Sequence, residues 1–203
     1  PWGFTSVATV TKWGWTFKKH AEDADKPGQN LHTKLTSEEA TAWHAVMLQE
    51  QSQTSGFYVV NDALYDASYA GAVSLNEKIE ALGADTWFLM TWGRRNGDSK
   101  NDWLYPDFLS MQDCLAQGYF NYRNGLSTAE RAVYVAPAGL AWQEIYLDHE
   151  AKGENPLDGS SLFSRLYTGD GSHPAALGSY LTGLVMYGAM TGRTPLNIGG
   201  TLN

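Results

Sequence analysis

Residues 169–195 read GDGSHPAALGSYLTGLVMYGAMTGRTP, a Gly- and Ser-rich turn that leads into an apolar stretch with helical spacing. Proline is typical of the first position of a helix and glycine of the position just past its end. Pro174 and Gly192 therefore predict a helix over residues 174–190. The turn before it places an aspartate and a histidine at the entrance to that helix.

Asp170 and His173 are three residues apart in this turn. A carboxylate at this distance can hold an imidazole in one tautomer, and the other ring nitrogen can then act as a general base. An Asp-Gly turn that happens to precede a histidine gives the same pattern, so the spacing alone leaves both interpretations open. The hydroxyl of Ser172, between the two, is expected to cap the helix.

Upstream, strand and helix patterns alternate. Short β-branched or apolar runs predict strands at 5–10, 43–48, 86–92 and 132–136. Helical patterns predict helices at 62–82, 107–122 and 139–149, with a further helix start at Thr36-Ser-Glu-Glu and a loop at 153–169. This order predicts an α/β fold, a mainly parallel sheet between helices on both faces. The loops after residues 48, 92 and 136, and the loop before residue 174, are expected to converge at the carboxyl edge of the sheet.

Composition narrows the function. A chain of 203 residues suits one domain, and we expect residues 1–203 to form it. The net charge of −8 argues against nucleic acid as a partner. A membrane partner is not expected either, because no apolar run reaches the roughly 20 residues of a bilayer span. Cys114 is the single cysteine, and no Cys/His cluster predicts a metal or other cofactor. The compartment is left undecided.

Five blocks in order resemble the SGNH (GDSL-like) hydrolases, and more closely an uncharacterised bacterial SGNH-like subfamily. They are GWTFKKHAED at 14–23, VMLQEQSQ at 46–53, FLMTWGRRNGD at 88–98, VAPAGLAWQE at 135–144 and DGSHP at 170–174. The resemblance covers nearly the whole chain. It implies a three-layer α/β/α sandwich with a flavodoxin-like sheet.

The resemblance also implies roles for the matched residues. His173 would be the general base and Asp170 its orienting partner. The backbone N–H of Gly14 and the side-chain amide of Gln49 or Gln51 would form the oxyanion hole. Residues 91–94 would line the cleft, with Trp92 or Arg94 touching the substrate.

The chain departs from the family in its first block, which presents the serine nucleophile on a central strand before residues 5–10. That block has no counterpart here. Three other serines are weak substitutes: Ser99 of the Gly97-Asp98-Ser99 sequence follows the wrong strand, Ser52 lies in the expected oxyanion block, and Ser172 is expected to cap a helix.

Three explanations stay open. The favoured one is that the serine and its strand lie upstream of Pro1, or on a separate N-terminal peptide, and pair between strands 5–10 and 43–48. A second is a catalytically inactive carbohydrate-binding or self-assembling protein, with a neighbouring subunit supplying the strand. A third is that Ser52 or Ser99 is the nucleophile. The activity implied by the resemblance is the hydrolysis of small acyl esters, such as acetyl groups on carbohydrate.

Overall fold

A computed structural model describes residues 9–10, 12, 14–37 and 43–195. The chain divides into two compact units. The first consists of Pro1–Leu89 and Gln117–Val135, and the second of Met90–Ala116 and Ala136–Asn203. Each unit is described by itself below.

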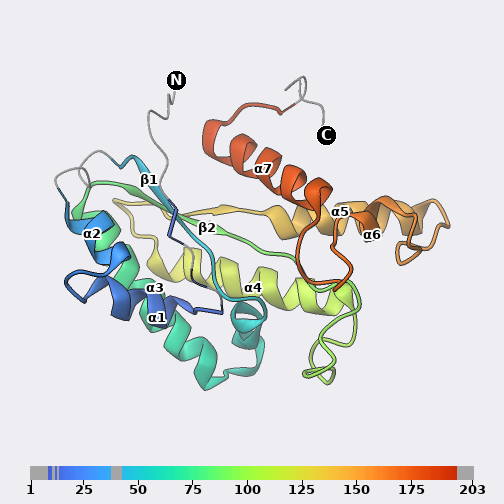
Figure 1. Ribbon diagram of the computed structural model, residues 1–203, viewed down its shortest axis with the longest axis horizontal. Coiled ribbons are helices and arrows are strands. Elements are labelled where there is room, and N and C mark those ends of the chain that lie inside the picture. Colours follow the sequence, from blue (N-terminus) through green and yellow to red (C-terminus); the bar gives the residue numbers. More distant parts are fainter. Residues whose placement is uncertain (1–8, 11, 13, 38–42, 196–203) are drawn as a thin grey trace. The chain divides into compact units, whose positions relative to one another are not determined.

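The elements follow the predicted alternation of strands and helices (Figure 1). The first unit contains α1 (Phe17–Ala24), α2 (Asn30–Thr36), β1 (Ala45–Leu48), the 3-10 helix η2 (Thr54–Val60), α3 (Ala63–Ala81) and β2 (Asp85–Leu89). The second contains α5 (Ala138–Ala151), α6 (Leu162–Arg165) and α7 (Ala176–Thr191). Two elements extend across the boundary, α4 (Phe108–Leu126) and β3 (Tyr134–Ala136).

Three strands form one sheet in the order β1-β2-β3. β1 and β2 are parallel, with Ala45 opposite Asp85 and Leu48 opposite Phe88. The strands expected at 43–48, 86–92 and 132–136 are confirmed, each shorter than predicted. Among the described residues β1 pairs with β2 alone. The strand expected at 5–10 lies mostly outside the described residues, so the further strand beside β1 stays a prediction.

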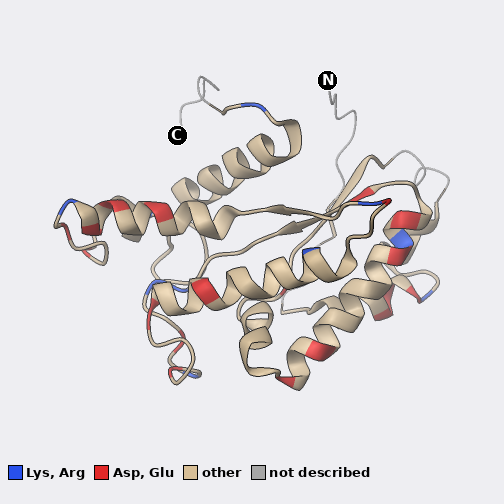
Figure 2. Ribbon diagram, turned by 180° about the vertical axis from the view of Figure 1, so that it is seen from behind, with Lys and Arg blue, Asp and Glu red and all other residues tan. Residues whose placement is uncertain are grey.

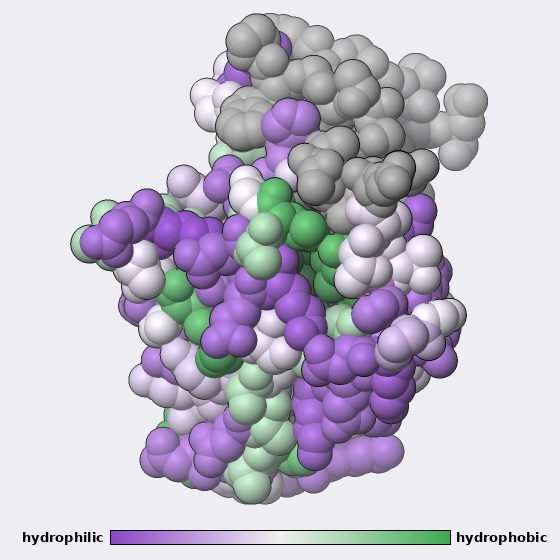
Figure 3. Space-filling view, turned by 90° about the vertical axis from the view of Figure 1, so that its left-hand side faces the viewer, coloured by the Kyte–Doolittle hydropathy of each residue, from purple (hydrophilic) through white to green (hydrophobic). Residues whose placement is uncertain are grey.

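The core of the first unit is built on aromatic rings. Phe17 at the start of α1 lies 5.6 Å from the ring of Phe88 and 5.5 Å from that of Tyr122, centre to centre. α3 comes close enough to α1 that a Cβ at Gly71 would lie 2.4 Å from the backbone nitrogen of Lys18. A side chain at position 71 would therefore force the two helices apart. The outer face near α1 and α2 is mostly hydrophilic, with scattered apolar surface (Figure 3).

The core of the second unit centres on Trp142, which is fully buried. Its ring stacks on that of Trp92 at 4.3 Å and meets that of Tyr167 edge-on at 4.7 Å. α7 packs here because Gly178 has no side chain, and a Cβ there would lie 2.3 Å from the carbonyl oxygen of Leu166. α7 carries no charged side chain, whereas α5 carries several acidic ones (Figure 2). No helix among the described residues is long and apolar enough to cross a bilayer.

Some predicted boundaries are wrong. Pro174 does not open α7, because it forms an antiparallel bridge with Tyr167, and the helix begins at Ala176. Ser172 does not cap that helix, since its N-cap is Ala175. Thr36 ends α2 and does not open a helix, and the residues after Ser37 in that motif lie outside the described part. The loop expected at 153–169 contains the short helix α6.

Candidate active site

The Asp170–His173 pair forms as the sequence predicts. His173 Nδ1 lies 2.6 Å from Asp170 Oδ2. The other carboxylate oxygen accepts the backbone N–H groups of Ser172 and His173 at 2.8 and 3.0 Å, and the Thr168 hydroxyl at 2.8 Å. The hydrogen bond from the His173 side chain, followed by those from the backbone and Thr168, holds the pKa of Asp170 well below its usual range. The carboxylate is therefore charged and its orientation is fixed.

The turn that carries the pair is closed by its own backbone. Thr168 N–H donates to the carbonyl oxygen of His173 at 2.8 Å, next to the Tyr167–Pro174 bridge. Gly171 takes a φ of +67°, in the left-handed region that suits glycine. This backbone conformation lets the chain reverse its direction within six residues. Asp170 and His173 therefore both lie in one short loop.

The segment after β2 anchors this loop. Arg95 N–H donates to the carbonyl oxygen of Gly171 at 2.8 Å, and the indole N–H of Trp92 donates to that of Ser172 at 3.1 Å. The segment after β2 also contacts the segment after β3. Met90 N–H donates to the carbonyl oxygen of Ala136, and Gly139 N–H donates to that of Met90, both at 3.0 Å. The predicted convergence of loops is thus confirmed for the three that lie in the second unit.

The resemblance implies that Trp92 or Arg94 touches the substrate. Trp92 is half-buried and positions the Asp170–His173 loop through its indole N–H. The guanidinium of Arg94 lies 2.6 Å from the carboxylate of Asp98, which is buried and also accepts the Asn101 side chain at 2.7 Å. Both residues therefore have a structural role, and contact with the substrate stays a prediction.

Two positioning residues were missed by the sequence analysis. The buried side-chain oxygen of Gln112 accepts Gly93 N–H at 2.9 Å, and Tyr167 donates its hydroxyl to the Gly93 carbonyl at 2.6 Å. Burial raises the pKa of the Tyr167 phenol, so it stays a donor. Both lie in apolar patterns that predict only core packing. A polar residue within such a pattern is the one signal that could have indicated them.

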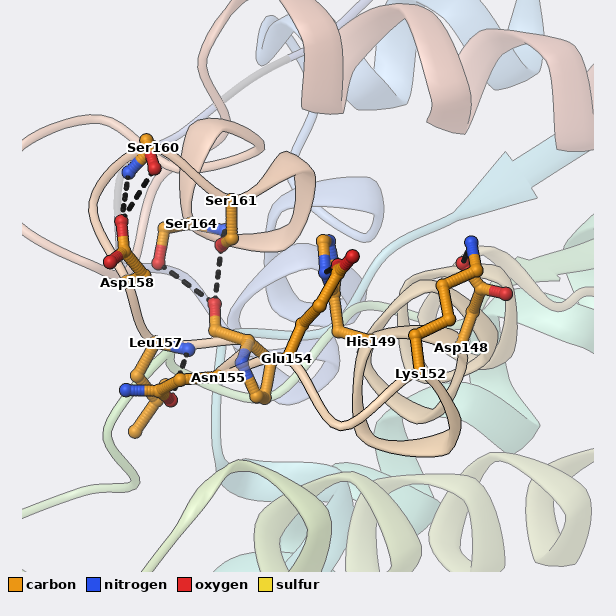
Figure 4. Close-up of polar contacts among 11 residues, drawn as sticks. Asp148, His149, Lys152, Glu154, Asn155, Leu157, Asp158, Ser160, Ser161 and Ser164 are labelled. Atoms are coloured by element: carbon orange, nitrogen blue, oxygen red, sulfur yellow. Dashed lines mark hydrogen bonds and ion pairs between the residues drawn. The ribbon is translucent and has the colours of Figure 1, made fainter.

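The connection from α5 to α6 is held by local polar contacts (Figure 4). Asp158 accepts the backbone N–H and the hydroxyl of Ser160 at 2.8 and 2.6 Å. Ser161 caps α6 by accepting Ser164 N–H at 3.0 Å, and both of these serines donate to the carbonyl of Pro156. The loop therefore fixes α6, which brings Phe163 into the core of the second unit.

The predicted oxyanion residues lie in the first unit. Gly14 is exposed, with a φ of +67° in the turn before α1. Gln49 is exposed directly after β1. Gln51 is half-buried, and its side-chain oxygen accepts the Thr54 hydroxyl at 3.1 Å. That these residues belong to the same active site as Asp170 and His173 stays a prediction.

Glu50, between these two glutamines, was not singled out from the sequence. It is 1% exposed. Both its oxygens accept Phe17 N–H, at 3.2 and 3.0 Å, and one accepts Gln51 N–H at 2.6 Å. The other accepts the hydroxyl of Ser68 from α3. Burial raises the pKa of Glu50, and the bonds from Ser68, Gln51 and Phe17 oppose that rise.

The three serines weighed as nucleophiles have different settings. Ser52 follows β1 with a φ of +24°, an uncommon value for a residue with a side chain. Ser99 is exposed in the loop that Asp98 organises. Ser172 is held by its backbone, between Asp170 and Trp92. Within the described residues no three His, Cys, Asp or Glu side chains are grouped as metal ligands.

The sequence matches no family model and no curated protein. Among solved structures it matches a protein named as a putative SGNH hydrolase from Slackia heliotrinireducens, with a TM-score of 0.62 and 24% sequence identity. The match covers 87% of this chain and 80% of that one. The predicted α/β fold is therefore confirmed, and it is similar to that of an SGNH hydrolase structure. At this identity the likeness establishes the fold alone.

Proposed function

We propose that this protein is an SGNH-type serine ester hydrolase in which His173 is the general base and Asp170 orients it. The observation that carries the proposal is the 2.6 Å contact between His173 Nδ1 and the Asp170 carboxylate, in a loop fixed at both ends. With Nδ1 engaged by a carboxylate, Nε2 is the ring atom that can accept a proton.

The reaction is a two-step acyl transfer. A serine hydroxyl attacks the ester carbonyl carbon while His173 Nε2 takes its proton, and Asp170 stabilises the imidazolium. The N–H of Gly14 and an amide of Gln49 or Gln51 donate to the oxyanion. The alcohol leaves with the proton from His173. Water then attacks the acyl carbon and gives a proton to His173. The bond from that carbon to the serine oxygen breaks, the carboxylic acid leaves, and His173 returns the proton to the serine.

The nucleophile in this proposal is a serine other than Ser52, Ser99 and Ser172. The substrates are small acyl esters, acetyl groups on carbohydrate in particular. The support for this substrate class is the sequence resemblance together with the shared fold.

The first experiment measures hydrolysis of 4-nitrophenyl acetate by the full-length protein. Replacement of His173 by Ala should lower kcat/KM by about 10³-fold or more, because the base is lost while binding is kept. His149→Ala is the matched control. His149, in the last turn of α5, forms the same kind of pair, with Nδ1 2.6 Å from the Glu154 carboxylate in the α5–α6 connection (Figure 4).

Turnover that survives His173→Ala would rule out the assignment of the base. Wild-type protein that hydrolyses no ester and reacts with no serine-directed phosphonate would instead favour the inactive, carbohydrate-binding alternative. Equal losses in both histidine variants would point to damage of the second unit.

A further inference from the structure

Glu50 joins two segments of the first unit that are far apart in the sequence. Its carboxylate accepts Phe17 N–H, 33 residues earlier, and the N–H of its own neighbour Gln51. Phe17 lies three residues after Gly14, and Gln51 lies in the loop that also carries Gln49. One buried carboxylate thus fixes both segments from which the proposed oxyanion donors come.

The start of α1 depends on this contact. Thr16, the N-cap residue, makes no side-chain capping bond, and the first N–H of the helix is satisfied by Glu50. A helix N-terminus favours a carboxylate, because its N–H groups carry partial positive charge. The segment that carries Gly14 is therefore held by a residue that lies two positions after the end of β1.

Two further elements hold Glu50 itself. Ser68 of α3 donates to its carboxylate and lies 2.9 Å from the Tyr122 hydroxyl of α4. The backbone N–H of Glu50 donates to the Tyr119 hydroxyl of α4 at 3.3 Å. With the side chain and the backbone both engaged, residue 50 is fixed against α1, α3 and α4.

We infer that Glu50 is a positioning residue that sets the Gly14 turn against the Gln49–Gln51 loop, and so pre-organises the oxyanion donors of the proposed ester hydrolase. The inference rests on the proposed function, since those donors belong to it. Glu50 does not touch the substrate in this role, and it acts through Phe17 N–H and Gln51 N–H.

The test compares Glu50→Ala with Glu50→Gln in the full-length protein, using 4-nitrophenyl acetate. Alanine leaves both backbone N–H groups without their acceptor, so kcat should fall by roughly tenfold or more while KM stays within about twofold. Glutamine keeps one oxygen for those N–H groups, and its NH2 can donate to Ser68. Its kcat should therefore stay within about threefold of wild type.

Ile79→Ala is the control for a loss of stability alone. Ile79 is fully buried in the same unit, on α3, and makes none of the contacts of Glu50 described above. It should lower the thermal midpoint and leave kcat unchanged. In amide NMR spectra, the Gly14 and Gln51 resonances should shift in Glu50→Ala and stay in place in Ile79→Ala.

Unchanged kcat in Glu50→Ala, with His173→Ala inactive, would overturn the role of Glu50 and leave the proposed function standing. Activity retained in His173→Ala would overturn the function itself, and the Gly14 and Gln51 resonances would still decide the role of Glu50. If Glu50→Ala does not fold, Glu50→Asp serves, because its shorter side chain withdraws the carboxylate from Phe17. Full kcat in that variant would equally overturn the inference.

Discussion

Asp170 accepts four hydrogen bonds, and half of its side chain stays exposed. These bonds lower its pKa from an ordinary value of about 3.9. A carboxyl whose pKa is lower in the folded state than in the unfolded state stabilises the fold at pH values above the unfolded-state pKa. That stabilisation is lost as the pH falls through the folded-state pKa. Between pH 5 and pH 9, Asp170 should therefore keep a constant charge.

This charge state predicts the pH dependence of the proposed reaction. On the acid side of the profile, the slope of log kcat/KM should not exceed about one, because the Asp170 carboxyl stays charged there and adds no further proton. Steady-state rates on 4-nitrophenyl acetate from about pH 5 to pH 9 measure it. A slope near two would show that a second group, such as Asp170, titrates in this range.

Asp170→Asn tests the orienting role separately. The amide cannot stabilise an imidazolium, and it favours the wrong tautomer of His173, so kcat should fall by about 10²- to 10⁴-fold. Circular dichroism checks that the loop and α7 still fold. A kcat within threefold of wild type would remove Asp170 from the mechanism.

The sequence predicts residues whose partners are close along the chain. Asp170 and His173 are three residues apart in one turn, so their spacing is readable. Glu50 is not readable in this way, because its partners Phe17 and Ser68 lie 33 and 18 residues away. Gln112 and Tyr167 are hidden for the same reason, since only the fold brings them to Gly93.

Among the elements, local signals predict α3 well and α7 less well. Asp62 caps α3 by accepting Leu64 N–H at 2.7 Å, and Gly83 follows its end with a φ of +70°. α7 starts later than predicted because Pro174 is held in the bridge with Tyr167. That bridge is a tertiary contact, which the preference of proline for helix starts cannot reveal.

Alanine substitutions at two glycines of α7 are expected to change the free energy of unfolding in opposite directions. A Cβ at Gly178 would lie 2.3 Å from the Leu166 carbonyl and 2.6 Å from the ring of Trp142, whereas a Cβ at Gly183 meets nothing within 4 Å. Gly178→Ala should lower the free energy of unfolding by about 1–3 kcal/mol through overpacking. Gly183→Ala should raise it by up to about 1 kcal/mol, because alanine favours the helix.

Denaturant unfolding of both variants measures these changes. The two substitutions add the same methyl group to the same helix, so propensity alone predicts equal shifts. Equal stabilisation of both would contradict the close packing of α7 on Leu166 and Trp142. Loss of stability at Gly183 would show a contact there that the structure lacks.

At the scale of the whole molecule, neither compact unit is one continuous stretch of chain. The chain passes between them after Leu89, Ala116 and Val135. The middle crossing lies inside α4, and the third lies inside β3. Separate unfolding of either unit would therefore break a helix and a strand shared with the other, which favours a single cooperative transition.

Ile79→Ala in the first unit and Gly178→Ala in the second test this together. Each should lower the midpoint of one common transition, followed by circular dichroism and by tryptophan fluorescence, since both probes report on a single two-state change. The single domain expected over residues 1–203 predicts that outcome. Two transitions, each moved by only one of the variants, would instead show that the units unfold independently. In that case α4, which both units share, would have to break near Ala116.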